Sequence, residues 1–581
     1  MKIVCLVKQV PRADAIEFDP ETKSLRREGV PLLLNPFDAA AVAQAAALKE
    51  SNGGGEVVAM TMGPPQAQAA LHTCLALGAD RCVHLSDRVF ALADTIGTSR
   101  TLAFAIEKEG DVDLVLCGRK TTDSETWQVP PETAAFLGWP HVTSVVEIEI
   151  DGTAIRAVRE TDDGLETYEL AGSAVLSLAH ARDTDTDADG RIDVWTASDL
   201  VEEVRENDKR FGQTGSPTRV LAVRDVTPER GGDVFSSVED AAPKLKALLA
   251  ERRIGPSAWE KPERLGERPG KTYDCWTLVE HVDGRPIRPS FELLGKGREL
   301  AGKLGGENVA LALGHDLAGV AREAARHGAD RVVLVEHERL ADYHPELSSH
   351  ALRSVVEQLR PHVLLTPATA NGRDLGPRVA GELELGMTGD CVGLGIDRGG
   401  RLIQTKPAYG GNIVSVIMGS TTPQLATVRP RTFEPLEPRE VEPAVERFDP
   451  GRWPDTRLRL SQLEPSSARD LDEADVVVCV GAELDEVPQL PDGVALGGTR
   501  EACERGLLPR NRQIGLLGRQ VAPRLLVAVG VKGGFEELTG FVKANVIAAV
   551  TADRDAPMAS AADVAVAGDW RAVLPALLDS I

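Results

Sequence analysis

A glycine-rich turn near the C-terminal end of the chain carries residue types that bind phosphate. The stretch GVKGG (530–534) follows the apolar run 525–529 and precedes a helical segment. The first N–H groups of a helix have no intrahelical partner and lie at the positive end of its dipole, so such a turn suits a pyrophosphate. Gly481 likewise ends the apolar run 476–480. Taken alone, the pattern also fits an ordinary turn between a strand and a helix.

An acidic loop has the spacing of a calcium-binding loop. Acidic residues alternate along it and a glycine stands at the sharp turn; these residues are Asp185, Asp187, Asp189, Gly190 and Asp193. The twelfth position is Thr196 instead of Glu, and no clear entering helix precedes the loop, so the sequence favours a solvated loop without a metal. Neither H-E-x-x-H nor G-x-S-x-G occurs, so hydrolytic catalysis has no support.

The composition narrows the class of protein. The chain has 581 residues, with 65 Lys and Arg against 89 Asp and Glu, which gives a formal net charge of −24. This negative charge argues against nucleic acid or an anionic membrane as the main partner. Eight scattered cysteines without a C-x-x-C pair argue against a disulfide scaffold or a cysteine metal site. No 18-residue apolar stretch occurs and the N-terminal residues are too charged for a signal peptide, so we expect a cytoplasmic, not membrane-spanning, protein.

Short apolar runs alternate with longer amphipathic segments along the chain. We expect strands at residues 1–7, 56–60, 114–117, 310–313, 332–335, 363–366, 476–480 and 525–529. Helical patterns lie between them, for example at 38–49 and 319–327. Continuous apolar strands that alternate with helices predict parallel sheets covered by helices on both faces.

The chain also resembles itself. Gly-Ala-Asp-Arg occurs at 78–81 and again at 328–331, and the segments that follow match at an offset of 248–249 residues. A nearly constant offset over several consecutive segments predicts two related α/β domains. Two stretches rich in proline and charge, 254–272 and 431–472, read as linkers. We therefore divide the chain into domains at 1–252, 273–432 and 473–581, with a linker at 253–272 and a hinge at 433–472.

Several stretches of the sequence resemble the electron transfer flavoproteins. The first half is similar to the β subunit of that family and the second half to the α subunit, so the chain resembles a natural fusion of the two. The stretches that carry this resemblance are VKQVP (7–11), LNPFDAAAVAQAAALKE (34–50), FLGWP (136–140), GSPT (215–218), GRDLGPRVA (372–380), QTKPAYGGN (404–412), ATVRP (426–430) and QIGLLGRQVAPRLLVAVGVKGG (513–534).

The resemblance implies the architecture. Two related, doubly wound parallel-sheet α/β domains should pack as a base. A third, flavodoxin-like or deoxyhypusine-synthase-like domain should bind FAD. The hinge at 433–472 should let this third domain swing between electron donor and acceptor.

The resemblance also implies an FAD site in the C-terminal domain, with Arg500 over the flavin ring. A fixed cation there would stabilise an anionic reduced flavin. Leu517 stands where the family has a hydroxyl donor. Glu537 stands where the family has a histidine, and a carboxylate at that position would oppose an anionic flavin. The matching positions are Thr499, Arg500, Gln513, Gly515, Leu517, Gly518, Gly530, Lys532, Gly533, Glu537, Thr551, Asp553 and Asp569.

A second nucleotide site is implied in the first half, around GRKTTDSETWQVPPE (118–132). Members of the family bind AMP there, or a second FAD, and both remain open, as does an ordinary polar loop. Pro130 replaces a family glycine and removes one N–H donor. The residues that match are Val7, Asn35, Gly118, Asp123, Thr126, Gln128 and Val129.

The function implied is electron carriage by FAD, rather than hydrolysis or group transfer. Electrons would come from a flavin-dependent dehydrogenase or another redox protein and pass to an acceptor such as a quinone oxidoreductase. The family's long basic docking loop is here a short acidic segment, 179–199, which predicts an unusual partner. Two alternatives remain: an NADH-linked, electron-bifurcating protein with two FADs, and a flavin-poor nucleotide-binding scaffold of the same fold.

Overall fold

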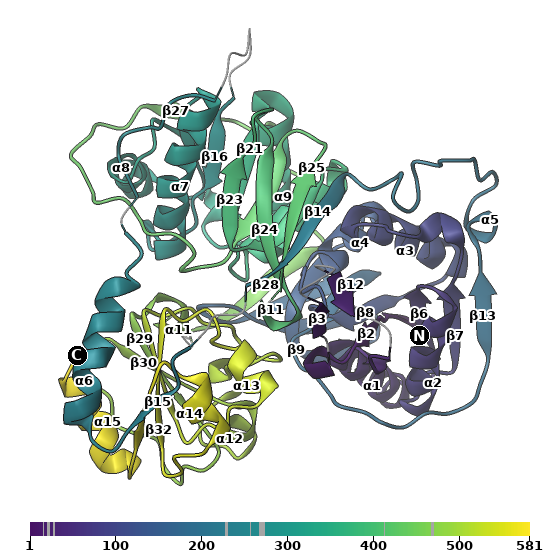
Figure 1. The fold of residues 1–581 in the computed structure, drawn as a ribbon. Helices are drawn as coiled ribbons and strands as arrows, with labels where there is room; N and C mark the ends of the chain where they lie inside the picture. Colours follow the sequence, from purple (N-terminus) through teal and green to yellow (C-terminus); the bar gives the residue numbers. More distant parts are fainter. Residues whose placement is uncertain are drawn as a thin grey trace.

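The computed structural model contains three α/β units, which Figure 1 shows in purple and blue, in teal and green, and in yellow. It describes residues 1–581 except 16, 20–23, 27–28, 227–229, 256, 266–272, 412 and 466–469. Each of the expected strands is present. The strands predicted at 476–480 and 525–529 are found with those bounds.

The first unit is built on a ten-stranded sheet. Its parallel part has the order β13-β7-β6-β1-β8-β12-β9, and β10, β11 and β28 extend it in antiparallel fashion. Helices α1 and α2 pack on one face, while α3 and α4 pack on the other. The strands are β1 (Lys2–Leu6), β6 (Glu56–Met62), β7 (Arg81–Leu85), β8 (Leu114–Gly118), β9 (His141–Asp151), β10 (Ala154–Glu160), β11 (Gly164–Ala171), β12 (Ala174–Leu178), β13 (Ile192–Trp195) and β28 (Leu458–Pro465).

The helices of this unit are α1 (Pro36–Ser51), α2 (Gln68–Ala76), α3 (Thr95–Glu109), α4 (Val129–Leu137) and α5 (Ala197–Leu200). Two small antiparallel pairs accompany them: β2 (Gln9–Pro11) with β5 (Leu32–Leu34), and β3 (Glu17–Asp19) with β4 (Ser24–Arg26). Short 3₁₀ turns occur here and in the other units, at η1 (Ala13–Ala15), η2 (Pro65–Ala67), η3 (Arg88–Phe90), η4 (Glu338–Leu340), η5 (Tyr409–Gly411) and η6 (Arg510–Arg512).

The second unit repeats the first. Its seven-stranded sheet is parallel, with the order β27-β20-β19-β16-β21-β26-β22. β16 and its neighbours correspond to β1 and its neighbours in the first sheet, which agrees with the internal repeat. The elements are β16 (Cys275–Leu278), α7 (Arg288–Leu304), β19 (Asn308–Gly314), α8 (Ala318–Arg326), β20 (Arg331–Glu336), α9 (Pro345–Leu359), β21 (Val363–Pro367), α10 (Gly372–Glu382), β22 (Met387–Cys391), β26 (Gln424–Val428) and β27 (Val445–Arg447).

A four-stranded antiparallel sheet and a small hairpin accompany the second unit. The sheet has the order β14-β25-β24-β23. Its strands are β14 (Thr218–Asp225), β23 (Gly393–Ile396), β24 (Leu402–Ala408) and β25 (Ile413–Gly419), and the hairpin is β17 (His281–Val282) with β18 (Arg285–Pro286).

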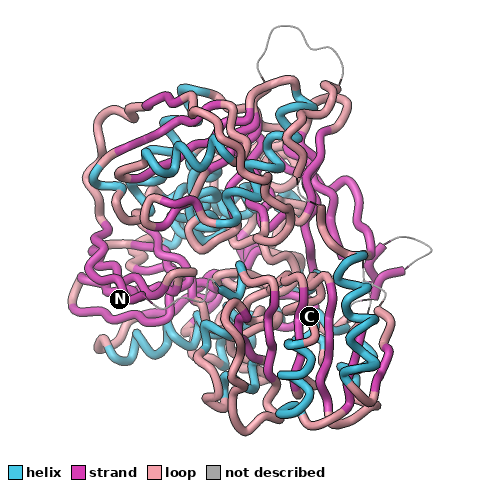
Figure 2. Tube along the Cα trace, turned by 90° about the vertical axis from the view of Figure 1, so that its left-hand side faces the viewer, coloured by secondary structure: helices cyan, strands magenta, loops and turns pink. Residues whose placement is uncertain are grey.

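The third unit is a six-stranded parallel sheet with the order β15-β33-β32-β31-β29-β30. In Figure 2 these strands lie side by side near the C-terminus. The elements are β15 (Asp233–Phe235), α6 (Val238–Glu251), α11 (Asp470–Glu473), β29 (Val476–Val480), β30 (Val494–Gly498), α12 (Arg500–Glu504), β31 (Leu525–Val529), α13 (Phe535–Thr539), β32 (Val546–Thr551), α14 (Pro557–Ala561), β33 (Val564–Ala567) and α15 (Trp570–Asp579).

Three segments near the predicted domain boundaries pair with strands that are distant in the sequence. β14 joins β25 of the second unit, β15 joins β33 of the third, and β28 joins β11 of the first. Helix α6 follows β15 and packs beside α15 (Figure 1). The division at 252 and 273 and at 432 and 473 stays a prediction. Parts of the proposed linker and hinge, 266–272 and 466–469, lie outside the described residues.

The described part of the chain has the apolar interior that the sequence predicts. All eight cysteines are free and buried, as expected for small apolar side chains. Among the described residues, no helix combines the length and the apolar character needed to cross a membrane.

Candidate functional site

A cavity of about 790 Å³ lies where the third unit faces the first, and we call it the acidic cavity. The first unit contributes Arg12, Asp14, Leu33, Pro36 and Asp183, among others. The third unit contributes loops that follow parallel strands. These loops lie together because the carboxyl ends of parallel strands meet at one edge of the sheet. Six carboxylates line the cavity: Asp14, Asp183, Glu501, Glu504, Glu536 and Glu537.

Most of the predicted C-terminal site residues that reach a cavity reach this one. Thr499 and Arg500 follow β30, whereas Lys532 and Glu537 belong to the turn and helix after β31. Seven of the predicted residues line the acidic cavity: Thr499, Arg500, Gln513, Gly515, Leu517, Lys532 and Glu537. Gly518 lines a neighbouring cavity instead. Gly530, Gly533, Thr551, Asp553 and Asp569 line neither.

The two cations of the predicted site are each held by carboxylates. The Arg500 guanidinium donates from Nη1 to Asp183 Oδ2 at 2.7 Å and from Nε to Glu504 Oε1 at 2.8 Å. Burial alone would lower the pKa of Arg500, but these two carboxylates raise it. Lys532 Nζ donates to Glu501 Oε2 at 2.6 Å. The charge that was expected to face a flavin is therefore shared with acidic neighbours.

The N–H groups of the glycine turn have a partner within the chain. Glu537 Oε2 accepts from the Gly533 N–H at 2.7 Å and from the Gly534 N–H at 2.9 Å. These are donors that the sequence assigns to a pyrophosphate. Two other predicted contacts also have local roles: Thr551 Oγ1 donates to the Asp553 carbonyl at 3.1 Å, and Asp569 caps α15.

Three residues of the predicted N-terminal site form hydrogen bonds or ion pairs within the protein. The Asn35 amide is fully buried and donates to the Lys120 carbonyl at 3.0 Å. Asp123 pairs with Lys8 Nζ at 2.6 Å, and Gln128 Nε2 donates to the Met387 carbonyl at 3.1 Å. None of the predicted residues lines the acidic cavity or the neighbouring cavity described next. These residues are Val7, Asn35, Gly118, Asp123, Thr126, Gln128 and Val129.

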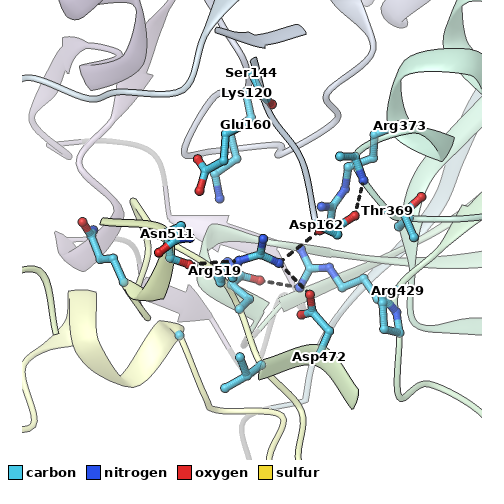
Figure 3. Close-up of a pocket in the computed structure, with 18 of the residues that line it drawn as sticks. Lys120, Ser144, Glu160, Asp162, Thr369, Arg373, Arg429, Asp472, Asn511 and Arg519 are labelled. Carbon is cyan, nitrogen blue, oxygen red and sulfur yellow. Dashed lines mark hydrogen bonds and ion pairs between the residues drawn. The ribbon is translucent and has the colours of Figure 1, made fainter. Parts of the chain in front are cut away.

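A second cavity of about 600 Å³ lies where the three units meet, and we call it the arginine cavity (Figure 3). It adjoins the acidic cavity, since Arg500, Glu504, Gln513 and Leu517 line both. Its cationic lining residues come from all three units and from the segment after β26, and are Arg119, Lys120, Arg373, Arg429, Arg431, Arg510, Arg519 and Lys543, besides Arg500.

Several of these cations are paired with carboxylates, and Arg519 is paired across a unit boundary. Arg519 Nη1 donates to Asp162 Oδ1 at 3.1 Å and to Asp472 Oδ2 at 2.6 Å (Figure 3). Arg373 binds Asp390 with two hydrogen bonds of 2.9 Å. Arg429 also donates to Asp390, at 3.1 Å. The Arg519–Asp162 pair connects the C-terminal unit to the first unit, whereas the two pairs with Asp390 lie within the second unit.

Other cations of the arginine cavity have less compensation. Burial, together with the charges of Arg519 and Arg373, lowers the pKa of the Arg119 guanidinium to about 10, although Glu160 opposes this shift. Burial and the charge of Arg429 lower the pKa of Lys543 to about 8. The Trp127 ring has the Arg373 guanidinium 4.4 Å from its centroid and that of Arg119 at 5.1 Å. Arg119 Nε and Trp127 Nε1 are buried without a hydrogen-bond partner. Such a cavity suits an anionic ligand with a planar ring.

The acidic loop does not form a metal site in the described part of the chain. No group of three or more His, Cys, Asp or Glu residues there is arranged to hold a metal ion. Asp185, Asp187 and Asp189 are exposed, and Asp187 accepts a hydrogen bond of 2.6 Å from Thr73 Oγ1.

The ionic residues of the arginine cavity were not predicted from the sequence. Arg373 and Arg429 lie within the stretches GRDLGPRVA and ATVRP, and Arg519 directly follows Gly518, so their neighbourhood was visible but their role was not. Arg519 and Asp162 are 357 residues apart in the chain. Spacing along one sequence therefore has no signal for their contact.

Two family models and several known proteins match this chain. Residues 22–200 and 275–451 match the electron transfer flavoprotein domain, and 470–542 match the electron transfer flavoprotein FAD-binding domain. The chain is 34% identical over 323 residues to an electron transfer flavoprotein subunit alpha of Clostridium acetobutylicum, covering 53% of this chain and 96% of the relative.

Two further relatives extend the comparison. An electron transfer flavoprotein subunit beta of Thermoanaerobacterium thermosaccharolyticum is 37% identical over 265 residues, covering 44% of this chain and all of the relative. Lactate dehydrogenase (NAD(+),ferredoxin) subunit LctC of Acetobacterium woodii is 33% identical over 368 residues, covering 60% of this chain and 88% of the relative.

Proposed function

The chain belongs to the electron transfer flavoprotein family, as a fusion of a β-subunit-like and an α-subunit-like half, and from this premise we propose that it holds FAD in the acidic cavity. In this proposal the flavin carries electrons from a flavin-dependent dehydrogenase, or another redox protein, to a downstream acceptor. Bound FAD supplies the redox chemistry, while the chain binds it, orients it and excludes water.

One observation carries this proposal. Loops after β30 and β31, together with the segment that links them, bring Arg500, Gln513 and Lys532 to one cavity at the carboxyl edge of the sheet. Ligands of open α/β sheets bind at that edge. The apolar group formed by Ala13, Phe37, Leu516 and Leu517, with Phe535 packed against it, lies beside the cavity and suits the isoalloxazine ring.

For the second nucleotide, AMP or FAD, we propose the arginine cavity. The loop after β8 presents Arg119, Lys120 and Trp127 to this cavity, whereas the predicted residues of the same loop bond within the protein. Cations beside an aromatic ring suit a nucleotide phosphate and base.

The adjoining position of the two cavities also favours the second candidate function, an NADH-linked, bifurcating carrier with two FADs. The relative that is named as a subunit of a lactate dehydrogenase acting on NAD(+) and ferredoxin supports this alternative.

The proposal is tested by counting the flavin and AMP released from the purified chain and by measuring FAD affinity in variants. One FAD is expected in the acidic cavity, and a second FAD would support bifurcation. R500A should weaken FAD binding by about tenfold, which corresponds to the loss of one charge-assisted contact between the guanidinium and FAD. R505A is the matched control, because Arg505 is exposed at the end of the same helix and lines neither cavity. No flavin binding after addition of FAD would overturn the proposal.

A further inference from the structure

Glu537 holds two adjacent donors of the glycine turn with a single oxygen atom. Its Oε2 lies 2.7 Å from the Gly533 nitrogen and 2.9 Å from the Gly534 nitrogen. A carboxylate near the start of a helix commonly satisfies free N–H groups, and here it stabilises α13. The same geometry places a negative charge at the point where these two N–H vectors converge.

The turn cannot easily present these donors elsewhere. Gly533 has a φ of +85°, which favours glycine. A Cβ atom at this position would lie 2.5 Å from the Met558 nitrogen, so the backbone of the turn packs closely against α14. The donors are fixed in direction, and any phosphate that used them would have to replace the Glu537 carboxylate.

The two cations nearest the glycine turn are already paired with carboxylates. Arg500 is paired with Asp183 and Glu504, and Lys532 is paired with Glu501. The neighbouring Glu536 adds a further carboxylate to the same wall, and its pKa is raised by burial and by nearby acidic residues. The cavity is lined by six carboxylates and by four cations, Arg12, Arg182, Arg500 and Lys532, so a diphosphate would meet an excess of negative charge.

We propose that Glu537 determines which part of a flavin the acidic cavity recognises. Its carboxylate takes the phosphate position of the glycine turn, so the cavity binds the isoalloxazine and ribityl portion and gains little from the diphosphate of FAD. This inference rests on the proposed function, because it assumes that a flavin binds in this cavity.

The test compares FAD with riboflavin, which has the same ring but no phosphate. Dissociation constants are measured by fluorescence quenching on the flavin-stripped full chain. The wild-type chain should bind both flavins with affinities within about threefold, and E537A should bind FAD about tenfold more tightly while its riboflavin affinity stays the same. E537Q should gain less, because its amide oxygen can still accept from the turn.

E536A is the matched control. It removes a carboxylate from the same wall and leaves the contacts of Glu537 with the turn in place. It reports the effect of charge alone, and its gain in FAD affinity should be smaller than that of E537A. Thermal melts verify that each variant is folded. If E537A does not fold, E537Q serves as the test.

Two results would overturn the inference alone. The first is that E537A binds riboflavin but has the same preference for FAD as the wild-type chain. The second is that E536A gains as much FAD affinity as E537A. Either result would show that Glu537 does not occupy a phosphate position. In both cases the proposed flavin site would stand. If neither flavin binds to any variant, the proposed function fails at this cavity and the inference falls with it.

Discussion

The Arg500 guanidinium lies 2.7 Å from the Asp183 carboxylate, and this pair joins α12 of the third unit to the acidic segment 179–199 of the first. Asp183 is 63% exposed, whereas Arg500 is 29% exposed. The arginine that faces the proposed flavin is thus partly neutralised by a residue from a different unit. In the proposed site, the acidic segment 179–199 would therefore contribute to the electrostatic environment of the flavin.

D183N should raise the reduction potential of bound FAD. Loss of this carboxylate leaves more of the Arg500 charge to stabilise the reduced flavin. For a two-electron couple, a change of about 0.5–1.4 kcal/mol corresponds to roughly 10–30 mV. Reductive titration of the FAD-loaded chain against a reference dye measures the shift.

D185N controls for the general charge of the acidic loop. Asp185 is exposed and lines neither cavity. Its replacement should change the potential by less than the D183N substitution does. Equal shifts in the two variants would contradict a specific role for the Arg500–Asp183 pair.

AMP binding in the arginine cavity should weaken as pH rises through about 8. The pKa of Lys543 is lowered to about 8 by burial and by Arg429. A bound phosphate favours the charged amine and raises this pKa, so binding takes up a proton. Between pH 7 and pH 9 the affinity should fall by about tenfold. Calorimetry in buffers of different ionisation enthalpy measures both the affinity and the proton uptake.

K543M should remove this pH dependence. Lys406 provides the comparison, because burial lowers its pKa to about 8 as well. Its Nζ donates to the carbonyls of Glu125 and Gly389 at 3.0 Å, and it does not line the arginine cavity. K406M should therefore keep the pH dependence. A slope that disappears in K406M and persists in K543M would refute the assignment.

D374N should destabilise the contact between the first two units. Asp374 on α10 is fully buried and lies 3.0 Å from His141 Nε2 and 2.6 Å from Thr143 Oγ1, both on β9. Removing a buried carboxylate that several partners hold in this way costs about 3–5 kcal/mol. Urea unfolding, monitored by hydrogen exchange of β9, measures the loss. D151N at the exposed end of β9 should have little effect.

The effect of D374N should shrink in acid. Burial alone would raise the pKa of Asp374, but His141 and Arg159 hold it well below its usual range. A carboxyl with a depressed folded-state pKa contributes its stability above its unfolded value, near 4, and loses it as pH falls through the folded-state pKa. The difference between wild type and D374N should therefore be full at pH 6 and smaller at pH 3. A constant difference would contradict this assignment.

Local pattern predicted the elements, and the family resemblance predicted the third unit. β29 and β31 are continuous apolar runs bounded by polar residues and glycine, so both bounds follow from composition alone. The C-terminal residues that gather at the acidic cavity follow strands of one parallel sheet. Their convergence is a property of that sheet and needs no distant contact.

The features that escaped prediction depend on contacts between distant segments. β15 has only three residues, and its pairing with β33 is a matter of register and burial. The arginine cavity forms from three units at once, as the contact of Arg519 with Asp162 shows. The Glu537 contact is local, by contrast, and an acidic residue three positions after Gly534 is a recognisable capping pattern.

L245A should destabilise the third unit although Leu245 precedes the C-terminal strand β29 by more than two hundred residues in the chain. Leu245 on α6 is fully buried against Val478, Val527 and neighbouring residues of the C-terminal sheet. Truncating a buried leucine costs about 2–5 kcal/mol. Hydrogen exchange should therefore accelerate in β31 and β33 while β6 of the first unit stays protected. K246A, at an exposed position of the same helix, should leave both unchanged. Equal acceleration in β6 and β31 would mean that the units unfold together and that α6 has no special role in the third.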